Sequence, residues 1–100
     1  MNRITAKRLL SEDVYRIEVE APDIARERKA GQFVIVQADT EWGERIPLTI
    51  ADADPGKGSI VLVFQAVGAS THKLARKEPG DEIAVLGPLG ILKWKSEEED

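Results

Sequence analysis

Short runs of strand-forming residues, separated by turn signals, recur along the chain and limit what it can fold into. The clearest run covers residues 14–20, where Tyr15, Ile17 and Val19 alternate with charged side chains, as in a strand with one face in a core. The same kind of pattern predicts further strands at residues 3–10, 32–38, 44–52, 59–66 and 82–86. Most links between them are of hairpin length, which favours antiparallel neighbours.

Turn and loop residues occupy the links. Gly, Pro and polar neighbours predict turns or loops at residues 11–13, 22–29, 39–44, 54–58, 78–81 and 87–90. Residues 71–77 are the only predicted helix, with Ser70 or its neighbour as the N-cap. Six strands and one short helix predict an all-β fold, a six-stranded antiparallel Greek-key barrel.

The net charge of −4 arises at the end of the chain. Residues 97–100 supply four of the 18 acids, so the 14 acids that remain balance the 14 Lys and Arg residues. We therefore assign residues 1–90 to the barrel domain and residues 91–100 to a C-terminal extension with an acidic tail. The barrel part has no basic stripe and its aromatic residues are scattered, which argues against nucleic acid as a partner.

Composition also narrows the chemistry. Cysteine is absent, which excludes disulfides, iron–sulfur clusters and thiolate metal sites within this chain, and the single histidine, His72, argues against zinc. No apolar run approaches the ~18 residues of a membrane span, and no secretion segment is visible, so we expect a cytoplasmic protein without a membrane partner. Few Asn and Met residues and abundant Glu, Lys and Arg resemble a thermophile's composition.

Two predicted strands are apolar on both faces, at residues 33–36 and 60–64. An antiparallel barrel normally keeps one face in water, so a ligand, another domain or another chain should cover the outside here. The alternative is ordinary scattered apolar surface. If the outside must be covered, Val34, Val36, Val61 and Val63 would be exposed in the isolated chain. We therefore predict that the chain forms a homodimer or binds a partner subunit.

Residues 68–71 have the composition of a phosphate-binding loop. Gly68 permits close backbone approach, Ser70 and Thr71 add hydroxyl donors, and the unpaired N–H groups of a helix start attract anions. The alternative is an ordinary capped helix start. Neither a Gly-x-Gly-x-x-Gly nor a Gly-Lys-Ser/Thr motif is present, so no dinucleotide fold or P-loop is indicated.

A second stretch, residues 44–52, combines Arg45, Pro47, Leu48 and Thr49 on one strand. The cation could hold an anion at one end, and the hydroxyl could bond a polar ring that lies on the Leu48 face. Arginine and threonine are also ordinary strand-surface residues. No pair of carboxylates and no nucleophile–base pair stands out, so we predict no catalytic residue and no metal ligand.

The order of these features resembles a known family. It comprises Pro-Leu-Thr-Ile, a Pro-Gly turn, an apolar strand, Gly-x-Ser-Thr before a helix, Pro-Gly-Asp and Gly-Pro-Leu-Gly. The set is similar to the FAD-binding barrel of the ferredoxin–NADP reductase superfamily and covers residues 3–90. The nearest branch contains the electron-transfer subunit of dihydroorotate dehydrogenase and the small subunit of NADH-dependent ferredoxin–NADP oxidoreductase, also called sulfide dehydrogenase or glutamate-synthase-like.

The resemblance implies the cofactor FAD and roles for particular residues. In the family's Arg-x-Tyr-Ser pattern the arginine meets the pyrophosphate, the aromatic covers the isoalloxazine and the hydroxyl reaches flavin N5. Leu48 and Thr49 match the last two positions, Pro47 is the usual proline of the branch, and Ile46 takes the arginine's place with Arg45 one residue earlier. Val63, Phe64 and Gln65 match the strand that runs beside the flavin's ribityl chain. Gly68, Ser70 and Thr71 match the loop that binds the pyrophosphate.

The implied function is that of the FAD-binding domain of a flavin-dependent electron-transfer subunit. Family members continue into a nicotinamide-binding domain, and this sequence ends soon after Gly-Pro-Leu-Gly. We therefore expect no hydride transfer by the isolated chain. The alternative is a non-catalytic barrel that binds a partner.

Overall fold

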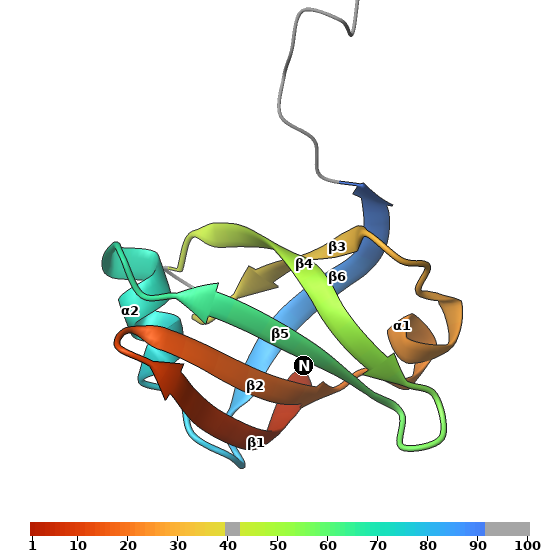
Figure 1. Ribbon diagram of the computed structural model, residues 1–100, viewed down its shortest axis with the longest axis horizontal. Coiled ribbons are helices and arrows are strands. Elements are labelled where there is room, and N and C mark those ends of the chain that lie inside the picture. The colour runs from red at the N-terminus through yellow and green to blue at the C-terminus, as the bar shows by residue number, and fades with distance from the viewer. Residues whose placement is uncertain (40–42, 92–100) are drawn as a thin grey trace, which may run out of the picture.

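The computed structural model describes residues 1–39 and 43–91, and their strands form a closed antiparallel barrel with a helix at each of two opposite ends (Figure 1). The order around the barrel is β1-β2-β5-β4-β3-β6, a Greek-key arrangement, which confirms the predicted fold class. The elements are β1 (Asn2–Ser11), β2 (Val14–Glu20), α1 (Pro22–Glu27), β3 (Gln32–Gln37), β4 (Arg45–Asp54), β5 (Ser59–Gln65), α2 (Ala69–Ala75) and β6 (Glu82–Ile91).

The alternating residues of β2 and β5 form the centre of the core, as predicted. The two strands pair in unbroken register from Val14↔Gln65 to Glu20↔Ser59. Their inward side chains are buried, except for the partly buried Tyr15, and they pack with apolar residues from the other strands and from both helices. The largest fully buried side chains are Ile4, Ile17, Val19, Val34, Val36, Ile50, Ile60, Leu62, Leu74 and Ile83.

Residues 22–29 are not simply a loop, as the sequence had predicted, because Pro22–Glu27 forms the helix α1. Pro22 stands in the first turn, where a missing N–H costs nothing, and Asp23 follows it. Ile24 and Ala25 are buried against the barrel. Two buried side chains are enough to fix one and a half turns, but too few to give a periodic signal in the sequence.

Helix α2 begins earlier than predicted. It runs over Ala69–Ala75 with Gly68 as the N-cap, whereas the sequence predicted residues 71–77 with Ser70 or its neighbour as the cap. The early start places Thr71 at the third helical position, where its hydroxyl reaches back to the backbone of the preceding loop.

The last strand continues through residues 87–90, which were predicted to be a turn. β6 extends from Glu82 to Ile91; its first two residues pair with β1, and the rest, from Ala84 to Ile91, pairs with β3, with register shifts beside Phe33. Gly87 allows this continuation, because a Cβ there would lie 2.9 Å from Cγ1 of Val34. Pairing with β3, which closes the barrel, thus keeps residues 87–90 in a strand although their composition favours a turn.

The prediction of four uncovered valines was wrong for three of them. Val34 and Val36 are fully buried in the core and Val61 is 8% exposed, so only Val63, at 38%, is open to solvent. The side chains that β3 turns away from the core are Phe33 and Ile35, which are half-buried. The predicted homodimer therefore loses the surface on which it was based.

Candidate flavin-binding site

Strands β4 and β5 pair along only part of their lengths. Their ladder covers Ile50 to Asp54 of β4, whereas the first half of β4, Arg45–Thr49, pairs with β3 and Val63–Gln65 of β5 pairs with β2. We call these two facing segments, which the described ladders leave unpaired with each other, the seam. Both stretches predicted to meet FAD adjoin it, so the fold brings them to one end of the barrel.

The seam half of β4 alternates between two environments. Ile46 and Leu48 are half-buried and pack against the core, whereas Arg45, Pro47 and Thr49 are exposed. Leu48 therefore presents an apolar, partly open surface, as a residue that covers a ring would.

Pro47 lies where β4 has a neighbour on one side only, so its missing N–H costs no ladder hydrogen bond on the open side. Thr49 is the last residue before pairing with β5 begins, at the closed end of the seam.

Arg45 points away from the Leu48 face. It lies opposite Gln37 of β3 and lines a cleft of about 290 Å³ with residues of β3 and β6, among them Ile35 and Leu86. Arg45 lies one residue before the family's arginine position, which is Ile46 here. Because neighbouring residues of a strand face opposite sides, Arg45 faces away from the side on which that arginine would lie.

On β5, the side chains of the three predicted residues also face different sides of the strand. Val63 and Gln65 are exposed, whereas Phe64 is 4% exposed and points into the core. The Phe64 ring stacks on Tyr15 with centroids 5.7 Å apart and planes inclined by 21°. Phe64 therefore supports the seam from inside, and the accessible surface beside it comes from its two neighbours.

The loop before α2 is held by Thr71. Its Oγ1 accepts hydrogen bonds from the backbone N–H groups of Val67 (2.9 Å) and Gly68 (3.0 Å) and donates to the carbonyl of Gly68 (3.1 Å). The hydroxyl that was predicted to bind phosphate thus shapes the loop. Gly68 has extended backbone angles, φ −141° and ψ −178°, and a Cβ there would meet nothing within 4 Å.

A contact that the sequence did not predict joins the two stretches. Ser70 Oγ of α2 donates a hydrogen bond to the carboxylate of Glu44, the residue before β4. The pair closes the open end of the seam. Only the long-range fold brings residues 26 positions apart together, so no local pattern could have identified Glu44 as part of this region.

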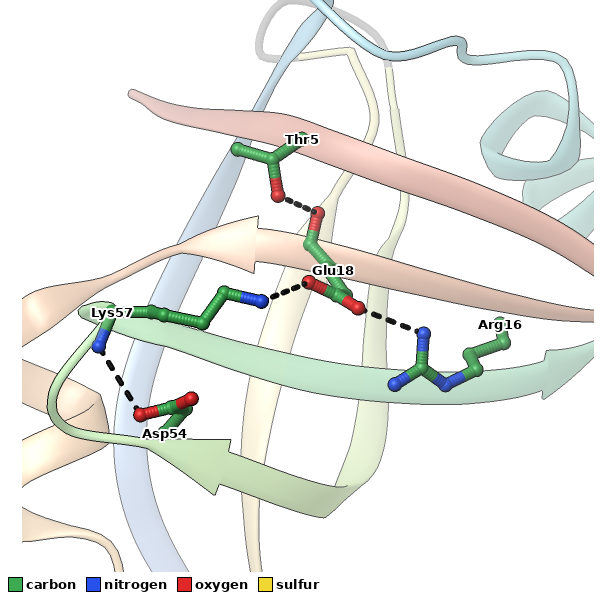
Figure 2. Close-up of polar contacts among 5 residues, drawn as sticks. All are labelled: Thr5, Arg16, Glu18, Asp54 and Lys57. Atoms are coloured by element: carbon green, nitrogen blue, oxygen red, sulfur yellow. Dashed lines mark hydrogen bonds and ion pairs between the residues drawn. The ribbon is translucent and has the colours of Figure 1, made fainter.

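The most strongly coupled charges lie elsewhere, on the outer face of β2 and the adjoining β4–β5 hairpin. Figure 2 shows Glu18 between Arg16, at 2.9 Å, and Lys57, at 3.5 Å. The hydrogen bond from Arg16, with the charge of Lys57, lowers the pKa of Glu18 below its ordinary 4.5, against the opposing effect of partial burial. This cluster contributes to the barrel wall and not to the seam.

Residues 1–39 and 43–91 contain no group of three acidic or histidine side chains placed to hold a metal ion. Among the same residues, no helix is long and apolar enough to cross a membrane.

Comparison with known proteins identifies the barrel. The oxidoreductase FAD-binding domain family matches residues 2–94. The chain belongs to this family. Its cofactor is therefore FAD, and the chain is an oxidoreductase FAD-binding domain.

Individual relatives agree with the family assignment. A protein of Clostridium beijerinckii encoded in the adh 3′ region is 47% identical over 91% of this chain and 31% of its own length. A homologue of the electron transfer subunit of dihydroorotate dehydrogenase B (NAD(+)) from Thermotoga maritima is 43% identical over 90% of this chain and 32% of its own. The chain thus spans about a third of the curated relatives it matches.

A solved structure of an NADH-dependent reduced ferredoxin–NADP oxidoreductase is also similar. It superimposes with a TM-score of 0.87 at 41% identity, over 94% of this chain and 34% of that one. This confirms the resemblance predicted from the sequence.

The residues around the seam fit a flavin nucleotide. The open space at Gly68 admits a phosphate beside the backbone, and the half-buried Leu48 supplies an apolar surface for a flat ring. The Glu44 carboxylate is a poor match, because it occupies the Ser70 hydroxyl and repels a phosphate at this end.

Proposed function

We propose that FAD lies along the seam, with its isoalloxazine against Leu48 and its pyrophosphate at Gly68 and Ser70. The observation that carries this proposal is the juxtaposition of the two motifs. The start of β4 and the start of α2 are held together by the Ser70–Glu44 hydrogen bond, and the seam runs from there to Thr49.

Each residue near the seam has a distinct part in this arrangement. Leu48 excludes water from one face of the ring, and the Thr49 hydroxyl is available to a polar atom at the ring edge. Val63 and Gln65 line the β5 side along the ribityl chain. Thr71 acts through the backbone of Val67 and Gly68 and holds the loop in the shape that receives the pyrophosphate. Arg45 was predicted to bind the pyrophosphate, but it lines the cleft beside β3 and β6, so its role in FAD binding has the least support.

When bound, the flavin supplies one- and two-electron chemistry, and the barrel residues bind and orient it. We propose that this chain carries electrons in company with a partner subunit. The support is that the Thermotoga relative is named as an electron transfer subunit homologue. A second copy of the chain is the alternative partner, and a cytoplasmic location stays a prediction.

Titration of the purified chain with FAD, followed by flavin absorbance and fluorescence, tests the proposal. We expect saturable binding at one FAD per chain that survives gel filtration, and weaker binding of riboflavin, which has no pyrophosphate. Equal affinity for FAD and riboflavin would contradict the placement of the pyrophosphate. Failure to bind either compound would favour the non-catalytic barrel.

A further inference from the structure

Lys7 of β1 holds the C-terminal end of α2. Its Nζ donates a hydrogen bond of 2.6 Å to the carbonyl of Ala75, the last residue of the helix. The last carbonyls of a helix have no partner within it and carry partial negative charge, so an ammonium group is a favourable partner. The Lys7 side chain is only 15% exposed, which distinguishes this contact from an ordinary surface interaction.

The same ammonium connects α2 to the aromatic pair beside the seam. It lies 5.4 Å from the centre of the Tyr15 ring, in range for a cation–π interaction. Tyr15 in turn stacks on Phe64 of β5. A continuous set of contacts thus runs from the end of α2 through Lys7 and Tyr15 to the strand that borders the seam.

The opposite end of α2 is fixed by the backbone. The N–H of Ala66, just before the loop, donates to the carbonyl of Asp13 in the β1–β2 turn at 2.8 Å. Leu74 is fully buried beneath the helix. The helix and the loop before it are therefore held at Ala66, at Ser70 through Glu44, at Leu74 and at Ala75, and Lys7 provides the last of these points.

We infer that Lys7 is a positioning residue for FAD: by holding Ala75, it sets how α2 and the preceding residues Val67 and Gly68 lie against β5. This inference rests on the proposed function, which places the pyrophosphate at that loop. Without the ammonium, α2 keeps its anchors at Ala66, at Ser70 and at the buried Leu74, but the carbonyl of Ala75 loses its charged partner. The helix and the loop before it are then held less firmly relative to the seam.

The ion pair between Lys7 and Glu78 is the lesser contact. Its length is 3.1 Å, but the Glu78 side chain is 66% exposed, and exposed pairs contribute little. The effect of Lys7 should therefore survive removal of this carboxylate. Glu78→Gln separates the ion pair from the hydrogen bond to Ala75.

The test compares FAD with riboflavin in the full chain. Lys7→Met keeps the apolar stem and removes the ammonium, and we expect FAD affinity to fall by about tenfold, as it would if the loop held its binding geometry only about a tenth of the time. Riboflavin affinity should stay unchanged, because riboflavin does not reach the loop. Lys7→Arg should restore FAD affinity, and Glu78→Gln should leave it intact.

Lys57→Met is the matched control, because Lys57 also pairs with a glutamate but lies on the outer β2–β5 face. Unchanged FAD affinity in Lys7→Met would overturn the inference, and so would an equal loss for both ligands. If Lys7→Met does not fold, Lys7→Gln provides the same comparison. A wild-type chain that binds the two ligands equally would instead contradict the proposed function, which separates the two failures.

Discussion

At the scale of single residues, Gly68 is a glycine that the backbone angles and the packing of the free protein do not require. Its φ of −141° is open to any amino acid, and its Cβ direction is empty. Gly87 is the contrast, because there the side chain of Val34 leaves no room for a Cβ. A glycine that the protein's own packing does not require is a natural place for a ligand to approach the backbone.

Replacement of Gly68 by valine should therefore weaken FAD binding more than folding. Valine favours extended backbone, so we expect a small loss of stability from the poorer N-cap. FAD affinity should fall by at least about tenfold, or 1.4 kcal/mol, because the side chain occupies the space of the phosphate. Gly90→Val in β6, also with an empty Cβ direction, is the control. Equal FAD affinity in the Gly68 variant and the wild type would remove Gly68 from the site.

Thr49→Val tests the closed end of the seam. The change keeps the shape of the side chain and removes the hydroxyl of an exposed residue, so the barrel should remain intact. If the hydroxyl bonds the flavin edge, FAD affinity or reduction potential should shift by roughly 0.5–1.5 kcal/mol. Thr5→Val, also on an exposed strand position, should shift neither. An unaltered flavin spectrum and potential in Thr49→Val would make Thr49 a structural residue only.

From the sequence we predicted candidate residues for the seam, but not the direction of every side chain. Leu48 is half-buried whereas Thr49 is exposed, so these neighbours face different sides of β4. The sequence could not reveal that the Thr71 hydroxyl forms its hydrogen bonds with the backbone of the preceding loop, since these bonds depend on where the helix begins. Nor could it reveal Glu44, whose contact with Ser70 depends on how β4 and α2 meet in the folded chain.

At the scale of elements, local pattern predicted the strands well and the short or interrupted elements poorly. β2 carries a full alternation, and its predicted bounds are those observed. α1 has too few turns for a periodic signal, and the Gly-Pro-Leu-Gly segment of β6 has turn composition. In both cases tertiary contacts determined the structure: burial of Ile24 for α1, and pairing with β3 for β6.

The ion pairs of Glu18 on the outer face of β2 predict how the stability of the fold depends on pH. A carboxyl whose pKa is lower in the folded state stabilises the fold above its ordinary pKa, and the effect is lost as pH falls through the lowered value. Glu18 is such a group. Glu18→Gln should therefore be less stable than wild type near neutral pH, by roughly 0.2–1 kcal/mol.

This difference in the free energy of unfolding should shrink as the pH falls below 4.5, the ordinary pKa of the group. Chemical denaturation of both proteins across that range measures it. The variant Glu20→Gln, which loses only the more exposed pair with Arg3, serves for comparison. A difference that stays constant with pH would contradict the assigned pKa shift.

At the scale of the whole molecule, the fold class followed from the sequence because every level of pattern agreed. Strand alternation, turn chemistry and a shortage of helical segments all indicated one closed β structure. The faces of β3 and β5 were harder to predict, because both carry apolar residues on each side. Only the closed barrel decided that Val34 and Val36 point inward and that Phe33 and Ile35 point outward.

The seam has a consequence for hydrogen exchange. Because Arg45–Thr49 and Val63–Gln65 each have a strand neighbour on one side only, every second backbone amide on these segments lacks a ladder partner. Such amides should exchange with deuterated solvent quickly in the free chain, while the amides of Ile17 and Leu62 exchange only on global unfolding. Bound FAD should slow the exchange of the seam amides by covering them, in addition to any slowing of the core amides that comes from the higher global stability of the complex. Seam amides that still exchange quickly in the FAD complex would show that FAD binds elsewhere.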